Sequence, residues 1–242
     1  MELPLYNLPQ KLAAEFIGTF VVVFTAAGAI CAEEYLRGAN QKSPGALGCA
    51  LAYGLAVAVM VGAMAHISGG HLNPAVTVGL WVTRRLGWLQ GLLYCVAQLL
   101  GGVAAAYVLI AVLPDTGWRF DALRWITPET MTDFSRWNAM LLEGVLTFIV
   151  VFVYFAAVVD AAGVGGTSSR VGGFAVGLTV AIETLVAAPF TGAALNPARS
   201  FGPALATHHW QNHGVYWVGP LFGGALAGMV YNAFFLRDQP HS

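Results

Sequence analysis

Six long apolar segments recur along the 242 residues and restrict what this chain can fold into. Each is close to the ~20 residues that a helix needs to cross ~30 Å of hydrocarbon. Only 10% of the residues are charged, against about 25% in soluble domains, which leaves too few charges for a water-facing surface. We therefore predict an all-α membrane protein with six transmembrane helices in one domain, residues 1–242. The apolar segments are 12–32, 45–67, 88–113, 139–159, 171–190 and 214–236.

Charges, cysteines and histidines argue against several other classes. A formal net charge of −1 argues against binding to nucleic acid or a polybasic contact with lipid headgroups. Cys31, Cys49 and Cys95 have no ligand spacing, so we expect packing residues rather than a disulfide or metal site. The histidines of the loop at 208–213 have no carboxylate nearby, so no metal is expected there either. We expect no cofactor and, because no basic stretch precedes the first apolar segment, no cleaved signal.

The tripeptide Asn-Pro-Ala occurs twice, in SGGHLNPAVT at 68–77 and in TGAALNPARS at 191–200. A second similarity, between AEFIGTF and LEGVLTF, puts Glu15 and Glu143 at matching places near the start of each half. Because three crossings are an odd number, the second half must enter the membrane from the opposite face, as in the inverted repeats of transporters. The predicted units are the repeats, about 8–113 and 138–236, and a connector, about 114–137.

Each tripeptide carries the residues of a helix start, since Asn is a leading N-cap residue and Pro is preferred at the first helical position. The helices that follow have only some ten residues each, about 74–83 and 197–206, which is about 15 Å or half a bilayer. We predict two half-helices that enter from opposite faces and meet by their N-termini at the midplane. Irregular backbone at that depth is tolerated only where it is buried in protein or lines a water-filled cavity.

The meeting point of the half-helices has the chemistry of a pore for neutral molecules. Two helix N-termini contribute roughly half a positive charge each, which opposes the entry of cations and protons. The side-chain amides of Asn73 and Asn196 supply donors for a passing water oxygen; the alternative is that both asparagines are only caps. The predicted pore centre consists of Asn73, Pro74, Ala75, Asn196, Pro197 and Ala198.

Other polar residues of the apolar segments have expected supporting roles. We expect Glu15 and Glu143 to accept backbone N–H bonds from the re-entrant loops and so hold the bends; a proton relay is the alternative. His71 lies near the inner mouth and either lines the pore or is a hydrogen-bonded neutral imidazole. Glu183 has no polar counterpart in the first half, and we expect it at a subunit interface or anchoring a loop.

Two glycine pairs have the small-xxx-small spacing that lets membrane helices approach closely. They are Gly173 with Gly177 and Gly224 with Gly228. We predict packing roles for both pairs.

The segments HISGGHLNPAVT, TGAALNPARSFGPA and YWVGP at 216–220, with the two glutamates, resemble the aquaporin (major intrinsic protein) family over nearly the whole chain. The resemblance implies a homotetramer in which each subunit has its own pore. It also implies an outer selectivity filter in which an arginine repels cations and donates hydrogen bonds to the permeant. By spacing from the two asparagines, the filter positions are Tyr53, Thr184, Ala193 and Arg199.

The details resemble the water-conducting branch of the family. Ser200 follows the arginine, whereas the glycerol-conducting branch resembles NPARD. Thr184 stands where strictly water-selective members have His, which implies a wider and less polar gap. The flanks of both tripeptides resemble the plant tonoplast type, of which some members pass ammonia, urea or hydrogen peroxide.

We predict a passive water channel that excludes protons and ions and is not an enzyme, with these neutral solutes as candidate further permeants. One alternative is a glycerol or small-solute facilitator. Another is an ion-coupled secondary transporter, which needs an ionisable or cation-coordinating group at the midplane, where the sequence has neutral asparagines. The expected partners are water, membrane lipid and further copies of the chain. We expect the cell (plasma or inner) membrane with cytoplasmic termini, although Lys and Arg divide equally between the two sides.

Overall fold

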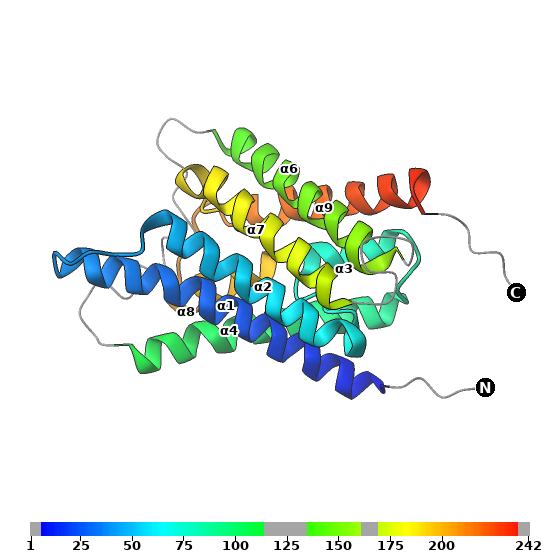
Figure 1. Cartoon of the computed structure of the whole chain (residues 1–242), viewed down its shortest axis with the longest axis horizontal. Coiled ribbons are helices and arrows are strands. Elements are labelled where there is room, and N and C mark those ends of the chain that lie inside the picture. Colours follow the sequence, from blue (N-terminus) through cyan, green and yellow to red (C-terminus); the bar gives the residue numbers. More distant parts are fainter. Residues whose placement is uncertain (1–5, 114–134, 161–168, 237–242) are drawn as a thin grey trace, which may run out of the picture.

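The computed structural model describes residues 6–113, 135–160 and 169–236, and these residues form helices and loops without a strand. The helices are α1 (Leu8–Gly38), α2 (Gly45–Ser68), α3 (Pro74–Val82), α4 (Trp88–Val112), α6 (Arg136–Tyr154), the π-helical turn η1 (Phe155–Val159), α7 (Ser169–Thr191), α8 (Pro197–Thr207) and α9 (Val215–Phe234). Figure 1 shows the long helices side by side, with the start of α1 and the end of α9 at the same end of the molecule.

Five of the described helices are long and apolar enough to cross a membrane: α1, α2, α4, α6 with η1, and α7. The remaining long helix, α9, has 20 residues, or about 30 Å, but its glycines, proline and tyrosines lower its hydropathy. It packs against α6 and α3 and completes the predicted set of six. The predicted all-α architecture is confirmed. Most of the predicted connector lies outside the described residues, and the repeat boundaries stay predictions.

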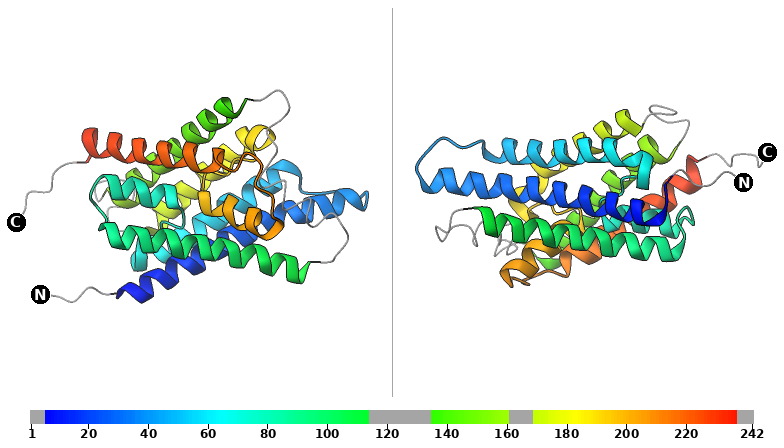
Figure 2. Two further views of the ribbon diagram at one scale, coloured as in Figure 1. Left: turned by 180° about the vertical axis from the view of Figure 1, so that it is seen from behind. Right: turned by 90° about the horizontal axis from the view of Figure 1, so that it is seen from below.

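The two halves of the chain pack by the same scheme. In the first half α1 packs against α4, and in the second α6 packs against α9, while α2 and α7 pack against each other. The right-hand view of Figure 2 shows α1 and α4 side by side. Each half-helix packs on the last long helix of the other half, α3 on α9 and α8 on α4. This exchange ties the two halves into one body and brings the half-helices inside it.

Glycines allow these helices to approach closely. Where α2 crosses α7, a Cβ on Gly54 or on Gly177 would overlap the carbonyl oxygen of the other. In α9, Gly224 and Gly228 face the backbone of α3, and a Cβ on either would collide with it. A Cβ on Gly173 would likewise collide with the backbone of α2 at Gly62. The predicted packing role of Gly173 with Gly177 and of Gly224 with Gly228 is confirmed, and Gly54 is a further close contact.

Candidate functional site

Both half-helices begin with an asparagine cap, as predicted. Asn73 precedes α3, and its side-chain oxygen accepts the N–H of Ala75 at 2.8 Å. Asn196 precedes α8 and accepts the N–H of Ala198 at 2.9 Å. Both asparagines have extended backbone, which is the usual N-cap conformation. The local chemistry of the tripeptide therefore starts a helix twice, with nine residues in α3 and eleven in α8.

The tips of the half-helices are joined by a reciprocal pair of hydrogen bonds. The Nδ2 of Asn73 donates to the carbonyl of Leu195, and the Nδ2 of Asn196 donates to the carbonyl of Leu72, both at 2.9 Å. Leu72 and Leu195 both have left-handed backbone, with φ of 53° and 58° respectively, which is uncommon for residues with a side chain. Because each amide has two N–H donors and uses one here, the other is available to a permeant.

Glu15, from α1, is fully buried and holds the first re-entrant loop. Its carboxylate accepts the backbone N–H groups of His71 at 3.0 Å and of Leu72 at 2.7 Å. It also accepts the hydroxyl of Ser68 at 2.6 Å and the amide of Gln98 at 2.7 Å. The predicted backbone bonds are therefore present, and they fix the left-handed turn that leads into α3.

Glu143, from α6, holds the second loop in the same way and is also fully buried. It accepts the backbone N–H groups of Ala194 at 3.0 Å and of Leu195 at 2.8 Å, and the hydroxyl of Thr191 at 2.6 Å. Both carboxylates therefore hold their loops as predicted, Glu15 with four accepted bonds and Glu143 with three.

His71 lies beside the first loop in a polar network that sequence analysis found only in part. Its Nδ1 is 3.1 Å from the hydroxyl of Thr77, which also accepts the amide of Gln98 at 2.9 Å. The imidazole contacts the rings of Tyr94 and Tyr154 edge to face, at 5.1 and 6.0 Å between centroids. Gln98 was not predicted to take part, although an amide inside an apolar segment is a signal worth following.

A narrow cavity passes the joined tips and carries both asparagines and His71 on its wall. It offers about 20 Å³ to a water molecule, enough for about one at a time. The remaining wall is mostly apolar, with valines from α1, α2, α3, α6 and α7: Val22, Val57, Val61, Val76, Val150, Val176 and Val180. Tyr53 and Tyr154 also line it, so its polar residues are the two asparagines, His71 and these tyrosines, set among apolar walls.

The predicted filter residues are all buried, and two of them, Arg199 and Tyr53, are in contact. The guanidinium carbon of Arg199 is 4.8 Å from the ring centroid of Tyr53. The Tyr53 hydroxyl donates to the carbonyl of Ala194 at 3.0 Å, next to Ala193. The Nε and Nη1 of Arg199 have no hydrogen-bond partner among the described residues. Thr184 is buried in α7 and donates to its own helix; no contact between it and the other three is resolved.

The remaining predictions concern Glu183, the cysteines and metals. Glu183 is 7% exposed, and no hydrogen bond to it from the described residues is resolved; its expected role stays a prediction. Cys31 is buried, Cys49 and Cys95 are free thiols, and the described residues contain no cluster that could hold a metal ion.

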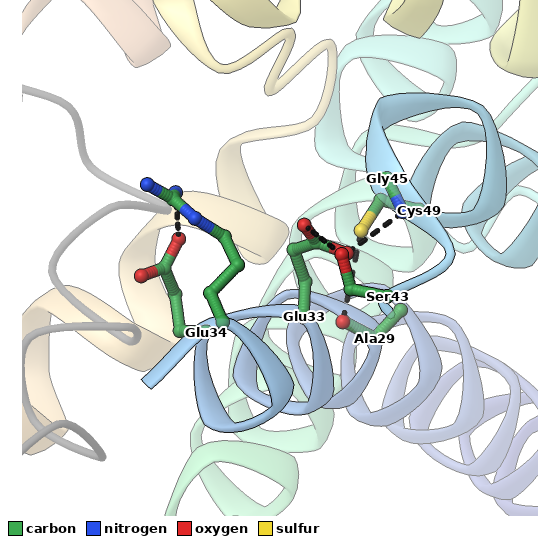
Figure 3. A network of polar contacts seen from close by, with 7 residues as sticks. Ala29, Glu33, Glu34, Ser43, Gly45 and Cys49 are labelled. Carbon is green, nitrogen blue, oxygen red and sulfur yellow. Dashed lines mark hydrogen bonds and ion pairs between the residues drawn. The ribbon is translucent and has the colours of Figure 1, made fainter. Parts of the chain in front are cut away.

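The last part of α1 carries a carboxylate, Glu33, that sequence analysis missed (Figure 3). Glu33 accepts the hydroxyl of Ser43 at 2.7 Å and the backbone N–H of Gly45 at 2.8 Å. Next to it the thiol of Cys49 donates to the carbonyl of Ala29 at 3.6 Å. These bonds join the end of α1 to the start of α2, on the helix that carries Tyr53.

Comparison with known proteins agrees with this architecture. A family model described as "Major intrinsic protein" matches residues 3–231. The chain is 44% identical over 235 residues to aquaporin TIP4-4 of Zea mays, covering 96% of this chain and 89% of that protein. It is 39% identical over 229 residues to aquaporin TIP2-1 of Arabidopsis thaliana, covering 94% and 88%. In fold it resembles the aquaglyceroporin of Plasmodium falciparum, with a TM-score of 0.83 at 24% identity, covering 94% and 97%.

The fold, with two half-helices joined across a narrow cavity, defines an integral multi-pass membrane protein. The family match and the relatives show that it is a channel and not an enzyme. The chain belongs to the major intrinsic protein family, as the sequence resemblance predicted. The channel is passive. This conclusion rests on the family match and on relatives that are named aquaporins.

Proposed function

We propose that this chain conducts water through the cavity between α3 and α8 and excludes protons and other ions. The observation that supports this most directly is the reciprocal pair formed by Asn73 and Asn196. Each amide caps one half-helix, bonds to the opposite loop and keeps one N–H for a permeant. A water oxygen at the tips accepts these donors, while the valine walls offer it no competing partner.

Ion exclusion follows from fixed charges at two levels of the pore. At the tips, the N-termini of α3 and α8 each contribute about half a positive charge. At the filter, Arg199 is buried with two N–H groups unpartnered among the described residues, so it can bond a neutral oxygen while repelling a cation. An ion-coupled transporter is disfavoured because the midplane groups are neutral amides and both nearby carboxylates are committed to the loops.

We assign the outer filter to Tyr53, Thr184, Ala193 and Arg199. The small side chains of Thr184 and Ala193 leave more space beside the arginine than larger residues would. Ammonia, urea and hydrogen peroxide are therefore proposed as additional permeants, and glycerol is the larger solute to test against them.

We also propose a homotetramer with one pore per subunit. Apolar side chains of α2 are exposed on the outside of a single copy: Leu47, Leu51, Leu55 and Val59. This face must be covered by lipid or by another copy. The predicted cell-membrane location has no support from the comparisons, because the relatives are TIP, or tonoplast intrinsic, aquaporins; cytoplasmic termini stay a proposal.

The test uses purified full-length protein in liposomes, followed by stopped-flow light scattering under an impermeant osmolyte and by an enclosed pH dye. We expect much faster shrinkage than in empty liposomes, with no added proton flux. Arg199→Val is expected to keep water flux and to admit protons or cations, whereas Arg85→Gln, which removes an exposed arginine bonded to Asn232, should behave as wild type. Slow shrinkage of the wild-type protein would refute the proposed conduction.

Mercurials test the filter assignment separately. None of the three cysteines lines the cavity, so water flux through the wild-type protein should be nearly insensitive. Ala193→Cys should become strongly inhibited, and excess thiol should restore the flux. Strong inhibition of the wild-type protein that is lost in Cys95→Ser would show that the pore runs elsewhere.

A further inference from the structure

The crossing of α1 and α4 contains buried polar atoms that the pore does not use. Thr19 and Gln98 are both fully buried. The hydroxyl of Thr19 and the side-chain oxygen of Gln98 have no hydrogen-bond partner among the described residues. Leaving a buried polar atom unpaired costs about 1–3 kcal/mol, and native proteins meet that cost with a partner or an ordered water.

Shared neighbours place these two atoms at the same crossing. Gln98 donates to the carboxylate of Glu15 at 2.7 Å, and Thr19 follows Glu15 by one helical turn, on the same side of α1. Three residues after Gln98, Gly101 touches the backbone of α1 on either side of Thr19: a Cβ on it would overlap the carbonyl of Phe16. Thr19 and Gln98 therefore both lie at the crossing of α1 and α4, within about one helical turn of each other.

The hydroxyl of Thr19, like that of its counterpart Thr147 in α6, lacks the bond within its own helix that several other threonines make. Thr83, Thr179 and Thr207 each donate to the carbonyl four residues earlier, at 3.0, 2.9 and 2.8 Å. That bond satisfies a hydroxyl within its own helix. Thr19 does not make it, so a partner for its hydroxyl has to come from outside its own helix.

The complementary capacities of the two atoms identify the ligand. A hydroxyl donates one hydrogen bond and accepts others, while an amide oxygen only accepts. A molecule that bonds to both must donate to Gln98 and can donate to or accept from Thr19. Water has this capacity and is small enough for a site between closely packed helices, where a buried water makes about three hydrogen bonds.

We propose that an ordered water molecule, separate from the permeant file, bridges Thr19 Oγ1 and Gln98 Oε1. It completes the polar network that runs from Glu15 through Gln98 to Thr77 and the first re-entrant loop. Its role is structural: it orients the Gln98 amide, whose N–H groups bond to Glu15 and Thr77. The site does not rest on the proposed conduction, since it lies in the α1–α4 seam.

An experimental structure that resolves ordered waters tests the proposal. We expect a density peak within about 3.2 Å of both Thr19 Oγ1 and Gln98 Oε1. The peak should persist in Thr19→Ser, which keeps the hydroxyl, and disappear in Thr19→Val. A direct bond from Thr19 to a protein atom with no peak between the two side chains would overturn the proposal, as would an unchanged peak in Thr19→Val.

Thermal unfolding of the same full-length variants gives a second readout. Thr19→Val should lower the apparent Tm more than Thr179→Val, a matched change that removes only a bond within one helix. Thr19→Ser should lie close to wild type. Equal Tm shifts for Thr19→Val and Thr179→Val would also overturn the proposal.

Discussion

The asparagine caps of the half-helices each have two structural roles. In a soluble protein an N-cap satisfies one helix end, and replacing it costs about 1 kcal/mol. Here the amide nitrogen of each cap also bonds to the loop of the other half. The cap could be predicted from the tripeptide alone. The bond to Leu195 or Leu72 could not, because these partners are more than 120 residues away in sequence.

His213, in the loop before α9, makes the stability of the folded protein depend on pH. Its Nε2 accepts the indole N–H of Trp217 at 2.9 Å, and the ring also contacts Trp210 at 5.0 Å between centroids. Burial lowers the pKa of His213 below its ordinary value of 6.5. The folded protein therefore binds fewer protons at this site than the unfolded chain. The stability that this supplies is present above about pH 6.5 and is lost as pH falls toward the lowered pKa.

The measurement is the apparent Tm of detergent-solubilised protein between about pH 8 and pH 5.5, the range in which histidine titrates. Wild type should lose stability as pH falls, and His213→Gln should lose less over the same interval. His208→Gln, in the same loop, is the matched control and should follow wild type. If the apparent Tm of His213→Gln fell with pH as steeply as that of wild type, the pH dependence of stability would come from another group.

Among the elements, the α2–α7 crossing depends on the absence of two side chains. Gly177→Ala places a methyl group against the carbonyl of Gly54, and overpacking of this kind costs about 1–3 kcal/mol. We expect a clearly lower apparent Tm. Gly87→Ala is the control, because a Cβ there meets nothing within 4 Å. A Gly177→Ala protein as stable as the control would contradict this, because it would mean that α2 and α7 can move apart at the crossing without a loss of stability.

For the whole molecule, the two re-entrant loops should behave as one coupled unit. Glu15 and Glu143 hold different loops, but these loops bond to each other through the asparagines. Glu15→Gln and Glu143→Gln should each destabilise the protein, because each leaves a buried N–H or hydroxyl without its acceptor. Since the loops share partners, the loss in the double variant should differ from the sum of the single losses by about 0.5–3 kcal/mol.

A double-variant cycle of chemical or thermal unfolding measures that coupling. Pairing Glu15→Gln with Gly87→Ala provides the control, since no contact joins those sites and their effects should add. Strict additivity of the two glutamate variants would indicate that the loops fold independently and that the tip-to-tip bonds contribute little.

Features that depend on local chemistry could be predicted from the sequence. The lengths of the apolar segments set the number of long helices, the tripeptide set both half-helix starts, and the matching places of Glu15 and Glu143 indicated the loop bonds. The contacts between distant segments depend on tertiary packing and could not be predicted in this way. They are those of Gln98 with Glu15, α3 with α9, Gly54 with Gly177, and Arg199 with the ring of Tyr53. Helix starts and spans are fixed by neighbours a few residues away, whereas these contacts join segments whose proximity exists only once the helices have packed.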